Sequence, residues 1–157
     1  MRIKLLCLSL CLVLILTGCG ATRDVQTKVK FDFDLVTENG AFFINAKVSE
    51  NKMEYTVLSP ENIKGLTFVF SDNRVDSEFL SHQQSFPFEK GDFGVLGSLY
   101  MAFEGLKGSS AQKRGDEFIA EVSCEGENYT FTVTELGIPI SVRFDNCEIL
   151  FKNITNL

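Results

Sequence analysis

Apolar and polar residues alternate along most of the chain from residue 25 onward. Period-2 alternation is typical of β-strands that bury one face. Turn signals separate the alternating runs, and the clearest is Asn39-Gly40, because both residues tolerate the positive φ of a tight hairpin. The pattern predicts nine strands, at about residues 25–35, 42–48, 53–57, 66–70, 74–80, 118–124, 129–134, 140–145 and 147–152.

One segment has helical periodicity instead. Apolar residues recur at spacings of three and four from Asp92 to Leu106, which predicts a helix with Asp92 as its cap. Gly94 and Gly97 disfavour a helix, or else let it approach a sheet closely. The apolar stripe contains Phe93, Leu96, Leu99, Tyr100, Phe103 and Leu106.

The remaining segments are predicted to be turns and loops between these elements. Ser59-Pro60 predicts a short helical turn capped by Ser59 and ended by Gly65. We expect loops at residues 81–91 and 107–115, the second being the more flexible because it is rich in Gly, Ser and Lys. Successive hairpins with a common apolar face predict an α+β domain, in which a strongly curved antiparallel sheet of eight or nine strands, a half-barrel, packs on one main helix.

The N-terminus predicts export. A short basic start, Met1-Arg2-Ile3-Lys4, precedes an apolar run from Leu5 to Leu16, which is shorter than the roughly 20 residues of a membrane span. The following Leu16-Thr17-Gly18-Cys19 resembles a bacterial lipobox. The resemblance implies that residues 1–18 are removed and that Cys19 carries a lipid with palmitate-type acyl chains; an ordinary signal peptide is the alternative. We then expect residues 19–24 to form a tether and residues 25–157 to form one domain.

Charge narrows the possible partners. Removing residues 1–18 leaves 139 residues and lowers the formal net charge from −6 to −8. An acidic chain lacks the basic footprint of a nucleic-acid-binding protein. We expect an exported protein on the outer face of the cytoplasmic membrane, or in an outer membrane, attached through lipidated Cys19.

Two of the five cysteines, Cys124 and Cys147, belong to the predicted domain. Both fall on inward faces at the same end of four successive strands. Two strands separate them in a meander, a distance of about 14 Å, whereas a disulfide needs Cα atoms within about 7 Å. We therefore predict two buried free thiols.

The element order resembles the LolA/LppX/RseB-type group of exported lipid and lipoprotein handlers. The resemblance rests on the lipobox, the early hairpins, the Ser59-Pro60 segment with Lys64-Gly65-Leu66, and the Gly137-Ile138-Pro139-Ile140 turn. It implies a curved-sheet fold that holds an acyl chain or a lipidated partner in its concave face. Some similar lipoproteins, including a germination-type one, act through a protein partner.

Catalytic chemistry finds little support in the sequence. His82 is the only histidine, and a triad with Ser81 or Ser85 would require geometry that sequence neighbours rarely provide. One histidine and two separated cysteines lack zinc-site spacing. We expect no enzyme activity, no metal and no cofactor.

Binding is the function class that the sequence supports better. The chain has 15 Phe and no Trp, which makes it unusually rich in one apolar aromatic residue. An aromatic core and an apolar groove for an acyl chain both fit this composition. Phe86 and Phe88, in the expected 81–91 loop, are either contacts at a cavity mouth or anchors to the core. Two functions follow: a lipid or other hydrophobic ligand held in the concave face, or a protein contact made by a domain with a filled core. The candidate ligand-binding residues are Phe86, Phe88, Phe93, Leu96, Leu99, Tyr100 and Phe103.

Overall fold

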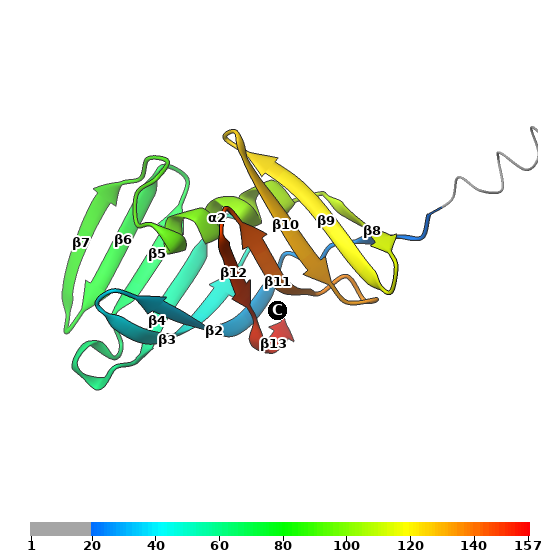
Figure 1. Ribbon diagram of the computed structural model, residues 1–157. Helices are drawn as coiled ribbons and strands as arrows, with labels where there is room; N and C mark the ends of the chain where they lie inside the picture. The colour runs from blue at the N-terminus through cyan, green and yellow to red at the C-terminus, as the bar shows by residue number, and fades with distance from the viewer. Residues whose placement is uncertain (1–19) are drawn as a thin grey trace, which may run out of the picture.

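The structure is a computed structural model that describes residues 20–157. The predicted signal peptide and Cys19 lie outside the described residues. Thirteen strands, one α-helix and one 3-10 helix lie within them (Figure 1). In chain order the elements are β1 (Thr22–Asp24), β2 (Val29–Thr37), β3 (Gly40–Val48), β4 (Met53–Ser59), η1 (Glu61–Ile63), β5 (Thr67–Ser71), β6 (Arg74–Phe79), β7 (His82–Pro87), α2 (Val95–Leu106), β8 (Ser110–Arg114), β9 (Glu117–Cys124), β10 (Glu127–Val133), β11 (Pro139–Phe144), β12 (Cys147–Leu150) and β13 (Lys152–Asn156).

The strands form two antiparallel sheets. Sheet A has the order β1-β8-β9-β10-β11-β12, and sheet B has the order β13-β2-β3-β4-β5-β6-β7. Most strands pair with their sequence neighbours, as the hairpin signals predict. The Asn39-Gly40 hairpin is confirmed, since Thr37 pairs with Gly40. The α+β class with one α-helix is also confirmed for the described residues.

The C-terminal segment joins the two sheets. β12 pairs with β11 in sheet A, and β13 pairs with β2 in sheet B. Between them, the Phe151 N–H donates to the Ile140 carbonyl over 2.9 Å. The chain then bends at Asn153, whose φ is +51°, and changes partner. The expectation of one half-barrel of eight or nine strands is therefore wrong in detail: the described chain has two open sheets.

Two expected loops contain strands. Residues 82–87 pair with β6, and residues 110–114 lie between β1 and β9. Neither strand has the alternation that reveals a buried face, because β7 is exposed throughout and β8 buries only Ala111. Backbone pairing, more than burial of a face, therefore keeps these segments extended. The expected tether of residues 19–24 is also shorter, since β1 begins at Thr22 and pairs with β8.

Helix α2 begins later than its apolar pattern predicts. Phe93 and Gly94 have positive φ values, which exclude a helical start at Asp92. Asp92 instead accepts a hydrogen bond from the Glu89 N–H over 2.9 Å. The predicted cap at Ser59 is likewise wrong, because η1 has no side-chain cap, whereas Gly65 ends the turn with positive φ as expected.

Helix α2 packs against both sheets. The Phe103 ring stacks on Phe31 of β2 at 5.6 Å between centroids and meets Phe131 of β10 edge-on at 5.3 Å. Tyr100 contacts Phe70 of β5. The aromatic residues on the inward faces thus converge on the helix and form one continuous core.

Cys124 and Cys147 are free thiols, as predicted. They lie at the same end of β9 and β12, and β10 and β11 run between them in meander order. Both are half-buried and not fully buried, which corrects that part of the expectation. Partial burial raises the pKa of each thiol, so neither has the thiolate character of a reactive cysteine.

All three tyrosines of the chain are buried, which predicts alkaline unfolding. Burial raises the pKa of Tyr55 and Tyr129, and it raises the pKa of Tyr100 to about 12. The unfolded chain loses these protons near pH 10, so the tyrosine contribution to stability is fully present below about pH 10 and falls as the pH rises toward 12. Because the chain lacks Trp, near-ultraviolet tyrosinate absorbance reports these groups directly.

We expect tyrosinate to form together with the loss of circular dichroism, in one cooperative step above about pH 11. In concentrated urea the same groups should titrate near pH 10. Gradual ionisation near pH 10 with unchanged circular dichroism would contradict the burial of these hydroxyl groups.

Candidate functional site

The predicted ligand-binding residues of the helix lie mainly in the core. Leu99 is 0 % and Phe103 is 1 % exposed. Rings of Phe31, Phe131 and Phe151 surround Phe103 within 6.0 Å between centroids. The ring of Phe103 therefore contacts side chains from both sheets.

Leu96 and Phe93 are half-buried at the beginning of the helix. The Leu96 carbonyl accepts a hydrogen bond from the Tyr55 hydroxyl over 2.8 Å. The Phe93 ring meets Phe70 edge-on at 5.4 Å. These contacts attach the start of α2 to β4 and β5 of sheet B.

Phe86 and Phe88 have different surroundings. The Phe88 ring meets Phe70 at 5.4 Å and Tyr100 at 5.5 Å, which makes it an anchor to the core. Phe86 belongs to β7, is 38 % exposed, and meets Phe93 edge-on at 6.3 Å. Of the two alternatives for this pair, the anchor describes Phe88, and Phe86 stays available at the surface.

A first hollow of about 500 Å³ lies where the β5–β6 turn, helix α2 and the end of β9 meet. Phe88, Tyr100, Met101 and Cys124 give it apolar walls. Lys90 spans its rim, donating to the Glu125 carbonyl over 2.7 Å and pairing with Glu127 at 3.5 Å. The other lining residues are Asp72, Asn73, Glu89, Glu104 and Glu125.

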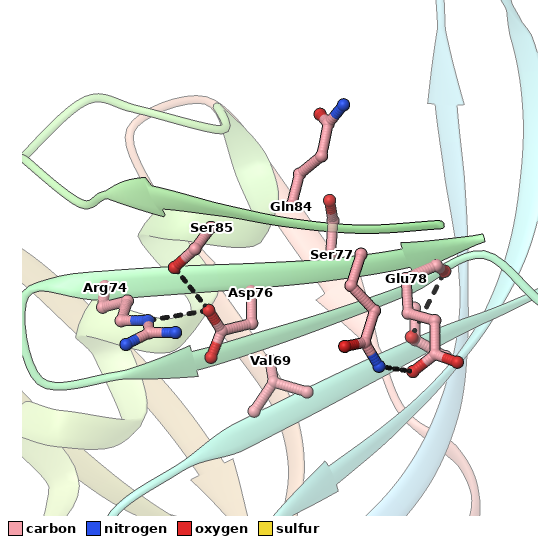
Figure 2. Close-up of a pocket in the computed structure, with 9 residues that line it drawn as sticks. Val69, Arg74, Asp76, Ser77, Glu78, Gln84 and Ser85 are labelled. Carbon is pink, nitrogen blue, oxygen red and sulfur yellow. Dashed lines mark hydrogen bonds and ion pairs between the residues drawn. The ribbon is translucent and has the colours of Figure 1, made fainter. Parts of the chain in front are cut away.

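A second hollow of about 400 Å³ lies on the outer face of β5, β6 and β7. Figure 2 shows Arg74 and Ser85 converging on Asp76, whereas Gln84 points to the other side of the strands. Ser85 donates to Asp76 over 2.6 Å and Arg74 over 2.7 Å, and these two bonds lower the pKa of the Asp76 carboxyl. Gln83 donates to Glu78 over 3.0 Å. The hollow is therefore polar, with its groups already hydrogen-bonded to one another.

The structure does not bring a catalytic triad together around His82. Ser85 donates to Asp76, and His82 pairs across the hairpin with Phe79. Within residues 20–157 there is no cluster of three or more His, Cys, Asp or Glu residues suited to a metal ion. The chemistry that these surfaces offer is hydrogen bonding and apolar contact.

The edge strand β7 is the feature that sequence reasoning missed. All six of its residues are exposed, and none is Asp, Glu, Lys or Arg. The Phe88 N–H donates to the Asn73 carbonyl over 2.9 Å, so alternation along the strand directs residues 82, 84 and 86 toward β6. The N–H groups of Gln83 and Ser85 then point away from the sheet. Pro87 occupies the next outward position, where its missing N–H costs no bond to β6.

A turn without the usual residues hides this strand in the sequence. Leu80 and Ser81 both adopt positive φ, which Gly or Asn would normally signal. Strand β7 also contains Pro87 and two glutamines, which have little strand preference. Leu80 ends an alternating run as an apolar residue, yet the structure exposes its side chain at this turn.

Comparison with known proteins finds no family model that matches the chain and no curated protein with significant similarity. No helix in residues 20–157 has the length and apolar character needed to cross a membrane.

Proposed function

We propose that this protein is an exported, lipid-anchored binding module that has no catalytic role and docks an extended segment of an envelope protein at the edge of β7. The anchor is the lipobox cysteine, Cys19. This is the second of the two functions that the sequence suggests. The chain resembles the LolA/LppX/RseB-type group in sequence. Some lipoproteins similar to that group act through protein partners, which is the analogy for this proposal.

The packing around Phe103 is the observation that carries the proposal. Aromatic side chains from both sheets fill the space where an acyl chain would lie in an open concave face. Leu99, Phe103 and Leu106 are each at most 1 % exposed. A ligand there would have to displace the helix, at the free-energy cost of opening a packed core. Binding at the surface requires no such change.

Strand β7 supplies the surface. An edge strand presents unpaired N–H and C=O groups that pair with another extended segment, and proteins usually block such edges with charged side chains. β7 lacks charged side chains, and its outward N–H groups at Gln83 and Ser85 are spaced to pair with alternate residues of an added strand. Half-exposed Phe86 provides an apolar contact beside that strand.

The position of β7 suits an anchored protein. Figure 1 shows the N-terminal end of the described chain beside β8 at one end of the molecule, and β7 at the other end. A lipid on Cys19 would therefore hold sheet A near the membrane and direct β7 away from it. A partner could then reach the edge strand without crossing the bilayer surface.

A second candidate is a short acyl chain or other hydrophobic ligand in the first hollow. Phe88, Tyr100 and Met101 line that hollow, and the first two belong to the ligand-binding set that the sequence predicts. This candidate places the ligand at the open end of the core and leaves the helix packed.

Removing one outward N–H tests the docking proposal. Gln83→Pro deletes an outward donor and the exposed side-chain bond to Glu78, but it leaves the backbone bonds from β7 to β6 in place, so we expect a melting temperature within about 2 °C of the parent. A photo-crosslinking residue at position 84 in living cells should give one discrete protein adduct, which Gln83→Pro weakens about tenfold. Intensity of that adduct on a denaturing gel is the measurement.

Gln83→Ala is the matched control, because it removes the same side chain and keeps the N–H. It should keep the adduct. Cys19→Ser in the same cells should move the protein out of the membrane fraction and lower the adduct. If Gln83→Pro and Gln83→Ala behave alike, strand addition at β7 is wrong. If Cys19→Ser stays in the membrane fraction, the lipid anchor is wrong.

A further inference from the structure

The edge of sheet A lies close in sequence to the proposed lipid anchor. Strand β1 begins at Thr22, three residues after Cys19. Three extended residues span at most about 11 Å. Ala21 is already fixed, since its carbonyl accepts a hydrogen bond from the Lys113 N–H over 3.0 Å. A lipid on Cys19 would therefore place β1 and β8 at the bilayer surface.

Two cations without ion pairs lie on this edge. The Arg23 guanidinium is 5.2 Å and the Lys113 ammonium 6.0 Å from the centroid of the Phe118 ring. Neither forms an ion pair with a carboxylate of residues 20–157, a property that they share with Lys30, Lys47 and Lys52. Two cations over one ring repel each other, so an anion between them would lower their energy.

The carboxylates of Asp24 and Glu117, which adjoin these positions in sequence, do not supply that anion. Asp24 follows Arg23 in β1, and Glu117 precedes Phe118 in β9. Alternation along a strand places their side chains on the opposite face of the sheet. Arg23, Lys113 and Phe118 share one face of β1, β8 and β9, which brings two cations together in a chain that is acidic as a whole.

An exposed leucine lies in the turn that Arg23 contacts. The Arg23 Nε donates to the Glu135 carbonyl over 3.0 Å, and the Gln26 N–H donates to the Gly137 carbonyl over 2.8 Å. These bonds fix the 135–137 turn against β1. Leu136, at the tip of that turn, is 75 % exposed. Cations next to an exposed apolar side chain are typical of surfaces that bind at a membrane interface.

We propose that this edge, formed by β1, β8 and the 135–137 turn, docks on the membrane. Arg23 and Lys113 bind phosphates of anionic lipid headgroups, and Leu136 enters the interface between headgroups and acyl chains. The inference rests on the proposed anchor at Cys19, because one lipidated residue brings the edge to the bilayer. It adds a fixed orientation, in which β7 faces away from the membrane.

A single tryptophan tests the contact, because the chain has none of its own. The lipidated full-length protein with Leu136→Trp is reconstituted into phosphatidylcholine vesicles with about 30 % phosphatidylglycerol and a brominated quencher lipid. Leu80→Trp, at the turn beside β7, is the matched control. We expect about threefold stronger quenching at position 136 than at position 80. Arg23→Gln with Lys113→Gln should remove most of that difference, as should high salt.

Intact mass and co-sedimentation with the vesicles are measured on the same samples, and they separate the two proposals. A lipidated, vesicle-bound protein with equal quenching at positions 136 and 80 would overturn the docking edge and leave the anchor in place. Quenching that persists unchanged in the double glutamine variant, or in vesicles of phosphatidylcholine alone, would overturn the role of Arg23 and Lys113. A protein without bound lipid that fails to sediment would overturn both.

Discussion

Phe103→Ala should destabilise the domain by about 3–5 kcal/mol, the cost of removing a buried aromatic ring that leaves a cavity. Phe103 is 1 % exposed, and its ring contacts residues of both sheets, so neighbouring side chains can fill the space only by moving the sheets. We expect the melting temperature to fall by about 10 °C or more. Denaturant unfolding followed by circular dichroism measures both quantities.

Leu80→Ala is the control for this experiment, because Leu80 is 77 % exposed and should change stability by less than about 0.5 kcal/mol. The comparison also bears on function. If the helix covered an open acyl-chain groove, truncating Phe103 would enlarge a space that is already empty and would cost much less. A loss below about 1 kcal/mol would therefore argue against the filled core and for the lipid-binding alternative.

Gly97→Ala should also destabilise the protein, although alanine is normally the better helix former by about 1 kcal/mol. A Cβ at position 97 would overlap the Asp92 carbonyl oxygen and lie 3.2 Å from the Phe88 ring. The carbonyl belongs to the backbone, so relief requires the segment before α2 to move. We expect a net loss of about 1–3 kcal/mol, typical of overpacking, measured by thermal and denaturant unfolding.

Ser98→Ala provides the matched helix substitution one residue later, and it should be neutral or slightly stabilising. A stabilised Gly97→Ala variant would mean that Phe88 and the 88–94 segment are not held against the helix. That result would favour the other alternative for Phe88, a contact at the mouth of a cavity.

The sequence was most informative where one face of a strand is buried. Runs such as Phe31-Asp32-Phe33 and Tyr129-Thr130-Phe131 alternate because their aromatic residues must reach the core, so the strands and inward faces of these runs were predicted correctly. The strand expected at 25–35 begins only at Val29, and the one expected at 147–152 ends at Leu150 before a separate strand, β13. The meander order of the last strands likewise followed from short turns, and with it the free state of Cys124 and Cys147.

The errors fall where burial does not govern the residue choice. Strands β7 and β8 are held by backbone pairing and bury almost nothing, so no hydrophobic pattern marks them. The start of α2 depends on positive φ at Phe93, which local sequence does not reveal. The candidate docking edge thus lies in a segment expected to be a loop. The helical residues chosen as ligand contacts were recognisable as apolar, but whether an apolar residue faces a ligand or another side chain depends on distant partners.

The C-terminal segment that joins the two sheets also sets the order in which the chain can fold. Strand β2, near the start of the chain, has β13 as one neighbour, and β12 completes the opposite sheet. Residues 147–156 therefore complete both halves of the core. Contacts between the two ends of a chain form late because closing a long loop costs entropy. During synthesis, sheet A lacks β12 and sheet B lacks β13 until these two strands have left the ribosome. The topology thereby makes cooperative folding of the domain wait for its last two strands.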